Sequence, residues 1–157
     1  MPDAELKTRL QSDLTEAIRS RDEVRAATLR LALTAVRSEE VAGNSARTLS
    51  DADVVAVLGR EARKRREAAT AYADAGRPDR AERESAELAV LDTYLPAQLT
   101  DEELSSLVAD AVAQAHAEGA SGPAAMGRVM KAVQPRIAGR AEGGRVAAEV
   151  RRQLSSS

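Results

Sequence analysis

The sequence predicts an all-α protein with two helical lobes. Hydrophobic residues make up 43% of the 157 residues, which is enough for a buried core. Aromatic residues are almost absent, with two Tyr and no Phe or Trp, so the core must consist of Ala, Leu, Val and a few Ile and Met. Such side chains favour closely packed helices, whereas strands prefer aromatic and β-branched residues. Apolar residues also recur every three or four positions, which is the spacing of an α-helix.

The first lobe, residues 1–95, is expected to contain about four helices. The last two of them are separated by Gly76-Arg77-Pro78. Glycine commonly ends a helix and proline suits the first helical turn, so this tripeptide predicts a tight turn inside a long helical hairpin. The expected helices cover roughly residues 3–20, 22–42, 50–75 and 78–94.

The second lobe, residues 96–157, is expected to be a smaller three-helix unit. Pro96 disfavours helical geometry at the residue before it, which predicts the lobe boundary. Thr100 and Glu103 have the spacing of a capping box and predict the start of a helix. Two further helices follow, one from about Pro123 and one after a glycine-containing loop over residues 139–144.

Composition limits the classes of function. The absence of Cys excludes disulfides, thiolate nucleophiles and cysteine metal ligands. The polar start of the chain does not have the pattern of a signal peptide, and no apolar run approaches the ~20 residues that a membrane span needs. We therefore expect a cytoplasmic protein without a membrane partner. Arginine far outnumbers lysine and alanine is abundant, which is typical of a GC-rich bacterial genome.

No pattern in the sequence predicts catalysis, a metal ion or a cofactor. His116 is the one histidine, and no motif supplies a nucleophile for it to activate. The sequence has neither a His pair nor a Glu-x-x-His motif, and no glycine-rich phosphate loop precedes a Lys-Ser or Lys-Thr pair. We predict a structural or surface role for His116, no catalytic residues and no bound cofactor or metal.

A basic cluster in the third expected helix predicts ion pairs across the hairpin. Arg65 and Arg66 lie on or beside its apolar stripe, and a charge on a buried face needs a partner. On the fourth helix, Glu84 lies within the apolar stripe and Glu87 at its edge, and counting outward from the turn places Arg66 near the level of Glu87. We therefore predict that these two arginines pair with these two glutamates. The rest of the cluster, Arg60, Arg63 and Lys64, is expected to form a solvated face, with RNA contact as the alternative.

A second basic concentration lies near the C-terminus. Residues 119–157 carry seven Lys or Arg against two acids, and glycines in this stretch would let the backbone approach a phosphate closely. The alternative interpretation is a solvated polar surface on which the glycines only end helices. The candidate RNA contacts are Arg128, Lys131, Arg136, Arg140 and Arg145.

Six short motifs stand along the chain: Leu29-Arg30, Lys64-Arg65-Arg66, Ala75-Gly76-Arg77, Tyr94-Leu95-Pro96, Gly127-Arg128-Val129-Met130-Lys131 and Gly139-Arg140-Ala141-Glu142-Gly143. They resemble those of the YqeY-like proteins over nearly the whole chain. Two of them, which span residues 127–131 and 139–143, are also similar to the tail of the B subunit of glutamine-dependent aspartyl/glutamyl-tRNA amidotransferase. Glu142 departs from both patterns. The YqeY-like proteins usually have Asp at this position, and the amidotransferase tail normally has Asn-Pro where this chain has Glu142-Gly143.

The resemblance implies a helical N-terminal lobe joined to a smaller three-helix lobe. It also implies a task, because the similar tail of the amidotransferase helps to hold tRNA while other domains perform the chemistry. The kinase-like core of that subunit and its amidase partner have no counterpart here, so carbon–nitrogen ligase activity is not expected of this chain alone. The first hypothesis is a non-catalytic module for tRNA or another structured RNA, recognised by shape and backbone because aromatic residues for base stacking are scarce. The alternative is a helical adaptor for an aminoacylation or amidation enzyme.

Overall fold

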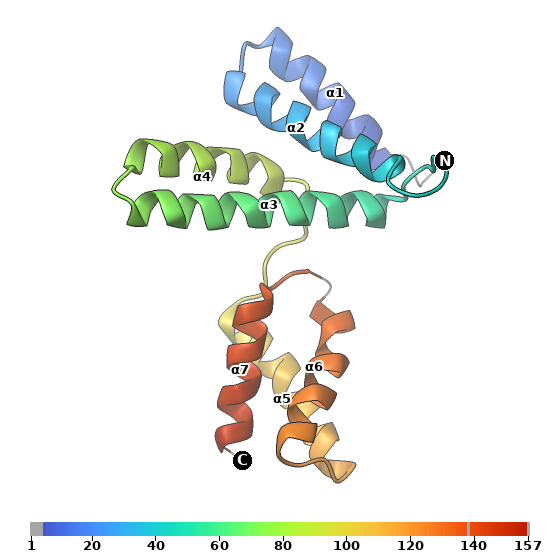
Figure 1. Cartoon of the computed structure of the whole chain (residues 1–157), viewed down its shortest axis with the longest axis vertical. Helices are drawn as coiled ribbons and strands as arrows, with labels where there is room; N and C mark the ends of the chain where they lie inside the picture. Colours follow the sequence, from blue (N-terminus) through green and yellow to red (C-terminus); the bar gives the residue numbers. More distant parts are fainter. Residues whose placement is uncertain (1–4, 138, 157) are drawn as a thin grey trace. The chain divides into compact units, whose positions relative to one another are not determined.

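The chain is all-α, which confirms the predicted fold class (Figure 1). The computed structural model describes residues 5–137 and 139–156, and within these ranges it has seven helices and no strand. The chain divides between Leu95 and Pro96 into two compact units, each with its own hydrophobic core. Each unit is described by itself below.

The N-terminal unit consists of two antiparallel helix pairs: α1 (Glu5–Arg19) with α2 (Glu23–Glu40), and α3 (Asp51–Asp74) with α4 (Pro78–Asp92) (Figure 1). Gly76 adopts a φ of +72° in the turn between α3 and α4, a conformation that favours glycine. The helix α2 packs against α3 and α4 as well as α1. The largest fully buried side chains of this core are Leu10, Leu29, Val36, Val54, Leu58 and Leu91.

Side chains close to the helix starts explain why the helices begin where they do. At α3, Ser50 Oγ accepts a hydrogen bond from Asp53 N at 3.1 Å, and Asp53 Oδ2 accepts one from Ser50 N at 3.2 Å. The predicted capping box of Thr100 and Glu103 is confirmed, with distances of 3.1 and 3.0 Å. Each box satisfies backbone N–H groups that have no partner inside the helix.

The C-terminal unit is a three-helix unit of α5 (Asp101–Ala117), α6 (Pro123–Ile137) and α7 (Gly143–Ser156), in which each helix contacts the other two. Gly143 and Gly144, which were expected in a loop, form the first turn of α7 instead. The fully buried side chains of this core are Val108, Val129, Val133, Ile137, Val146 and Val150.

Candidate functional site

Two of the five predicted RNA contacts hold the C-terminal unit together. Arg145 Nη2 donates hydrogen bonds to the Leu99 carbonyl at 2.8 Å and to Asp101 Oδ1 at 2.9 Å. Arg140 Nε donates to the Ala97 carbonyl at 3.0 Å, and the Arg140 carbonyl accepts from Leu99 N at 2.8 Å. These bonds tie α7 and the segment before it to the residues that lead into α5.

Two further predicted contacts form ion pairs with acids at α5. Arg128 Nη1 lies 3.3 Å from Glu118 Oε2, and Arg136 Nη2 lies 3.7 Å from Asp110 Oδ2. Lys131 is exposed and forms no ion pair with a described acid. Exposed pairs of this kind contribute roughly 0–1 kcal/mol, so they break at little cost.

The predicted cationic surface is therefore largely compensated within its own unit. Three of the five cations, Arg128, Arg136 and Arg145, face acids at α5 or its C-cap. The composition agrees, because residues 96–157 carry seven Lys or Arg and seven Asp or Glu. The excess of five positive charges in residues 119–157 is balanced by five acids, four of them in α5 and the fifth being its C-cap residue Glu118.

The buried charge of α3 lies between two carboxylates. Arg65 is 8% exposed, and its Nη1 lies 3.7 Å from Glu61 Oε1 while its Nε lies 3.7 Å from Glu87 Oε2. The Nε group forms no hydrogen bond, whereas Nη1 donates to the Glu61 carbonyl at 3.3 Å. The structure thus brings Arg65 and Glu87 together across the hairpin and adds Glu61 from within α3.

The neighbouring Arg66 contacts a residue that the helical pattern did not predict. Its Nη2 lies 3.5 Å from Asp92 Oδ1, near the end of α4. Successive residues of a helix point about 100° apart, so Arg65 and Arg66 meet different residues of the facing helix. Glu84, the other expected partner, is half-buried on α4 nearer to the turn.

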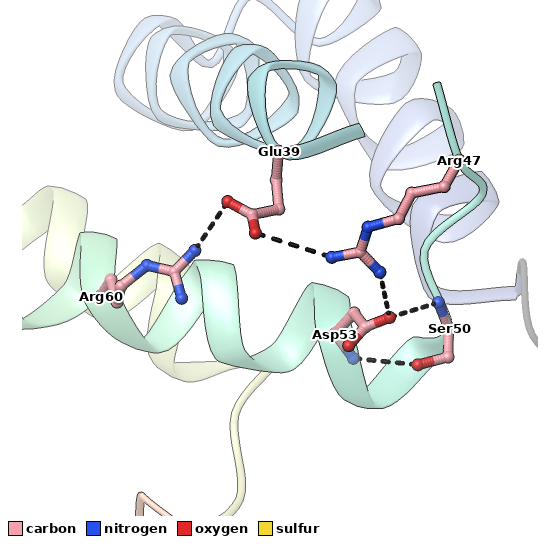
Figure 2. Close-up of polar contacts among 5 residues, drawn as sticks. All are labelled: Glu39, Arg47, Ser50, Asp53 and Arg60. Atoms are coloured by element: carbon pink, nitrogen blue, oxygen red, sulfur yellow. Dashed lines mark hydrogen bonds and ion pairs between the residues drawn. The ribbon is translucent and has the colours of Figure 1, made fainter. Parts of the chain in front are cut away.

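A polar network joins the end of α2, the following loop and the start of α3 (Figure 2). Arg47 lies between two carboxylates, 3.2 Å from Asp53 Oδ2 and 3.6 Å from Glu39 Oε1. Arg60 Nη2 lies 3.3 Å from the other oxygen of Glu39. The hydrogen bond from the Ser50 backbone lowers the pKa of Asp53. Arg60, although exposed, therefore connects α3 to α2 through Glu39.

Tyr94 belongs to a second network, at the end of the N-terminal unit. Its hydroxyl donates a hydrogen bond of 2.5 Å to Asp13 Oδ2, which also lies 3.6 Å from Arg25 and 3.8 Å from Arg9. The Arg9 guanidinium sits over the Tyr94 ring, 4.9 Å from its centroid. Burial, followed by the hydrogen bond to Asp13, raises the pKa of Tyr94. The network therefore links α1 and α2 to Tyr94, which stands two residues after the end of α4.

One face of α2 combines free cations with exposed apolar side chains, and we call it the α2 face. Arg30, Thr34, Arg37 and Val41 follow one another at three- or four-residue intervals, and Leu31 lies beside them. Leu31 is 50% exposed and Val41, the C-cap residue, is 65% exposed. Neither arginine forms an ion pair with a described acid, although most described Lys and Arg side chains do.

Leu31 differs from the apolar residues that share its side of α2. Val24, Ala27 and Ala35 are partly buried, whereas Leu31 is half-exposed. The sequence did indicate that Arg30 would form no ion pair within its own helix, because no acid stands three or four residues from it. The acid three residues after Arg37 is Glu40, and its Oε1 lies 2.8 Å from Lys7 Nζ instead.

The single histidine lies at an open hollow of the C-terminal unit. His116 is exposed, and it lines a hollow of about 430 Å³ with Met126, Arg151 and Leu154, where α5 and α7 end and α6 begins. Among the described residues, no three His, Asp or Glu side chains gather in a way that could hold a metal ion. None of the described helices has the length and apolarity needed to cross a bilayer.

These features define an all-helical protein of two units whose ionic side chains mostly pair within the unit to which they belong. Residues 7–154 match the family model described as Yqey-like protein. The chain therefore belongs to the family of YqeY-like proteins, as the motifs along its length indicated. No curated protein matches the chain.

Proposed function

We propose that this YqeY-like protein is a non-catalytic helical adaptor that binds a protein partner of tRNA aminoacylation or amidation. The observation that carries the proposal is the α2 face, where Leu31 and Val41 are exposed beside two arginines that form no ion pair with a described acid. Exposed apolar side chains grouped with uncompensated charge are typical of surfaces that bind other proteins. The link to aminoacylation or amidation comes from the family resemblance.

The polar clusters support a binding role over intrinsic catalysis. The Arg65 cluster, the Glu39 network and the Tyr94 network each join helices through ion pairs and hydrogen bonds. A nucleophile needs a base within hydrogen-bond reach, and His116 lies on an open hollow without such a partner among the described residues. We therefore do not expect this chain alone to catalyse carbon–nitrogen ligation, which in the amidotransferase is performed by other domains.

Binding of tRNA or another structured RNA through the C-terminal unit is the second candidate. The observation that favours it is Lys131, which is exposed and has no described acidic partner. The exposed pairs of Arg128 and Arg136 cost little to break, so phosphates could replace Glu118 and Asp110. Arg140 and Arg145 are less available, because their guanidinium groups bind backbone carbonyls.

Site-specific crosslinking in the native host separates the two candidates. A photo-crosslinking amino acid is placed at Thr34 on the α2 face, at Lys131 on α6, and at Glu82 on α4 as an exposed control. An adaptor gives a protease-sensitive, nuclease-resistant adduct at Thr34 that is missing at Glu82. RNA binding gives a nuclease-sensitive adduct at Lys131. A Thr34 variant that yields no more protein adduct than the control contradicts the adaptor proposal.

A further inference from the structure

The α2 face has a definite length and a definite chemistry. From Ala27, three residues before Arg30, to Val41, this side of α2 is about 21 Å long, which is four helical turns. Along it, Arg30 and Arg37 stand seven residues apart, so they lie on the same side of the helix. Leu31 and Val41 alternate with them, and Thr34 between them bonds the Arg30 carbonyl through its hydroxyl at 2.9 Å.

The acids nearest to this face are engaged elsewhere. Glu40 is held by Lys7 at 2.8 Å, and Glu39 by Arg60 at 3.3 Å and Arg47 at 3.6 Å (Figure 2). The α2 face is therefore positive, because these carboxylates are committed to other cations. The remaining acid on the same side, Glu23, lies at the opposite end of the helix from Arg37.

We infer that the α2 face docks one acidic, amphipathic helical segment of the partner, an inference that rests on the proposed adaptor function. Such a segment places carboxylates against Arg30 and Arg37 and apolar side chains against Leu31 and Val41. A partner helix of about four turns matches the length of the face, and helix-on-helix docking uses anchors at three- or four-residue spacing. Charge complementarity then sets the register of the two helices.

The same chemistry argues against RNA as the occupant. Two cations neutralise only two phosphates, so they supply little of the electrostatic attraction on which nucleic-acid binding depends. Covering Leu31 and Val41 with phosphates would bury no apolar surface of the ligand, and this face has no aromatic side chain on which a base could stack. An acidic helix with apolar side chains can pair its carboxylates with the two arginines and pack its apolar side chains against Leu31 and Val41.

The test uses the full chain and a fluorescein-labelled peptide of about 18 residues, with Leu at helical spacing on one face and Glu elsewhere. Titration is followed by fluorescence anisotropy. We expect saturable binding that weakens with salt. Arg30→Glu with Arg37→Glu is expected to weaken it at least about tenfold, since two charge contacts become repulsive. The matched control, Lys131→Glu with Arg151→Glu, makes the same charge change on the C-terminal unit and is expected to leave binding unchanged.

A second pair of variants tests the apolar half. Leu31→Ser is expected to weaken binding, whereas Ile18→Ser is expected to have no effect, although both side chains are 50% exposed. A peptide with Lys in place of Glu is expected to bind the Arg30→Glu, Arg37→Glu variant, whose far-UV circular dichroism should match that of the unaltered protein. The inference is overturned if the Leu/Glu peptide does not bind, if the control pairs lose as much affinity, or if a tRNA mixture binds this face with the same dependence on Arg30 and Arg37.

The two proposals fail separately. A protein adduct at Thr34 together with no binding of the Leu/Glu peptide leaves the adaptor standing and overturns the acidic helix as its partner. Absence of the Thr34 adduct overturns the adaptor itself. Self-association of the chain that the Arg30→Glu, Arg37→Glu variant abolishes would identify a second copy as the occupant and would also overturn the inference.

Discussion

The hydroxyl of Tyr94 donates a 2.5 Å hydrogen bond to Asp13 across 81 positions of sequence. The bond joins the first helix of the N-terminal unit to the last residues of that unit, and Arg25 and Arg9 complete the charge balance around Asp13. Because Tyr94 is 7% exposed, water replaces this bond poorly when it is lost.

Removing this hydroxyl is expected to destabilise the N-terminal unit. Tyr94→Phe should lower the free energy of unfolding by about 1–2 kcal/mol, because the charged carboxylate of Asp13 loses the hydrogen bond that the Tyr94 hydroxyl donates to it. Tyr72→Phe is the matched control, since Tyr72 contacts Arg80 through its ring. Both tyrosines lie in this unit, so each variant retains one of them as a fluorescence reporter during urea unfolding. Equal losses in the two variants would show that the Asp13 bond contributes nothing specific.

Arg65 is expected to matter far more than a neighbouring arginine of the same helix. Glu61 and Glu87 have side chains 15% and 13% exposed, and Arg65→Ala leaves them only the more exposed Lys64 and Arg83 as cationic partners. We expect a loss of about 2 kcal/mol in the free energy of unfolding, because a buried cation and its contacts across the hairpin are removed. Arg63→Ala removes an exposed pair with Glu67 and should cost under about 0.5 kcal/mol. Tyrosine fluorescence in urea measures both, and similar costs would contradict the assignment.

Arg145 and Arg136 are expected to differ although both were predicted as RNA contacts. Arg145→Ala removes two short hydrogen bonds to the start of α5 and should destabilise that end by about 1–2 kcal/mol. Arg136→Ala breaks only an exposed 3.7 Å pair and should change stability by less than about 0.5 kcal/mol. Amide hydrogen exchange over residues 101–117 reports the difference. Unchanged protection in Arg145→Ala would refute its structural role.

Glu149 is expected to make the C-terminal unit sensitive to acid. Hydrogen bonds from Arg152, and then from Gln153, lower the pKa of Glu149 from 4.5 to about 2. A group whose pKa is lower in the folded state stabilises that state above its unfolded pKa, and the contribution disappears as the pH falls from about 4.5 to about 2.

A carboxyl-carbon NMR titration measures this pKa directly. Arg152→Ala is expected to move the Glu149 midpoint upward, towards 4.5, and to reduce the loss of stability between these two pH values. Arg151→Ala is the control, because it removes the neighbouring positive charge, which has no described contact with Glu149. A midpoint that stays near 2 in Arg152→Ala would assign the shift to another group.

The helices and most of their boundaries, the start of α7 excepted, could be predicted from the sequence because their determinants are local. Thr100 and Glu103 stand three residues apart and cap α5 without help from any other element. Gly76 and Pro78 likewise end one helix and begin the next through their own backbone preferences. The all-α class and the family followed from the same level of information, namely composition, period and short motifs.

The candidate sites depended on the packing between helices. No periodicity along one helix states that Arg145 meets Leu99, that Arg66 reaches Asp92, or that Leu31 stays half-exposed. Those outcomes depend on the rotation and register of helices that are distant in sequence. The sequence by itself thus determined the elements and their order, whereas the tertiary structure decided which charges are neutralised and which face remains open, because an ion pair requires two side chains to meet in space.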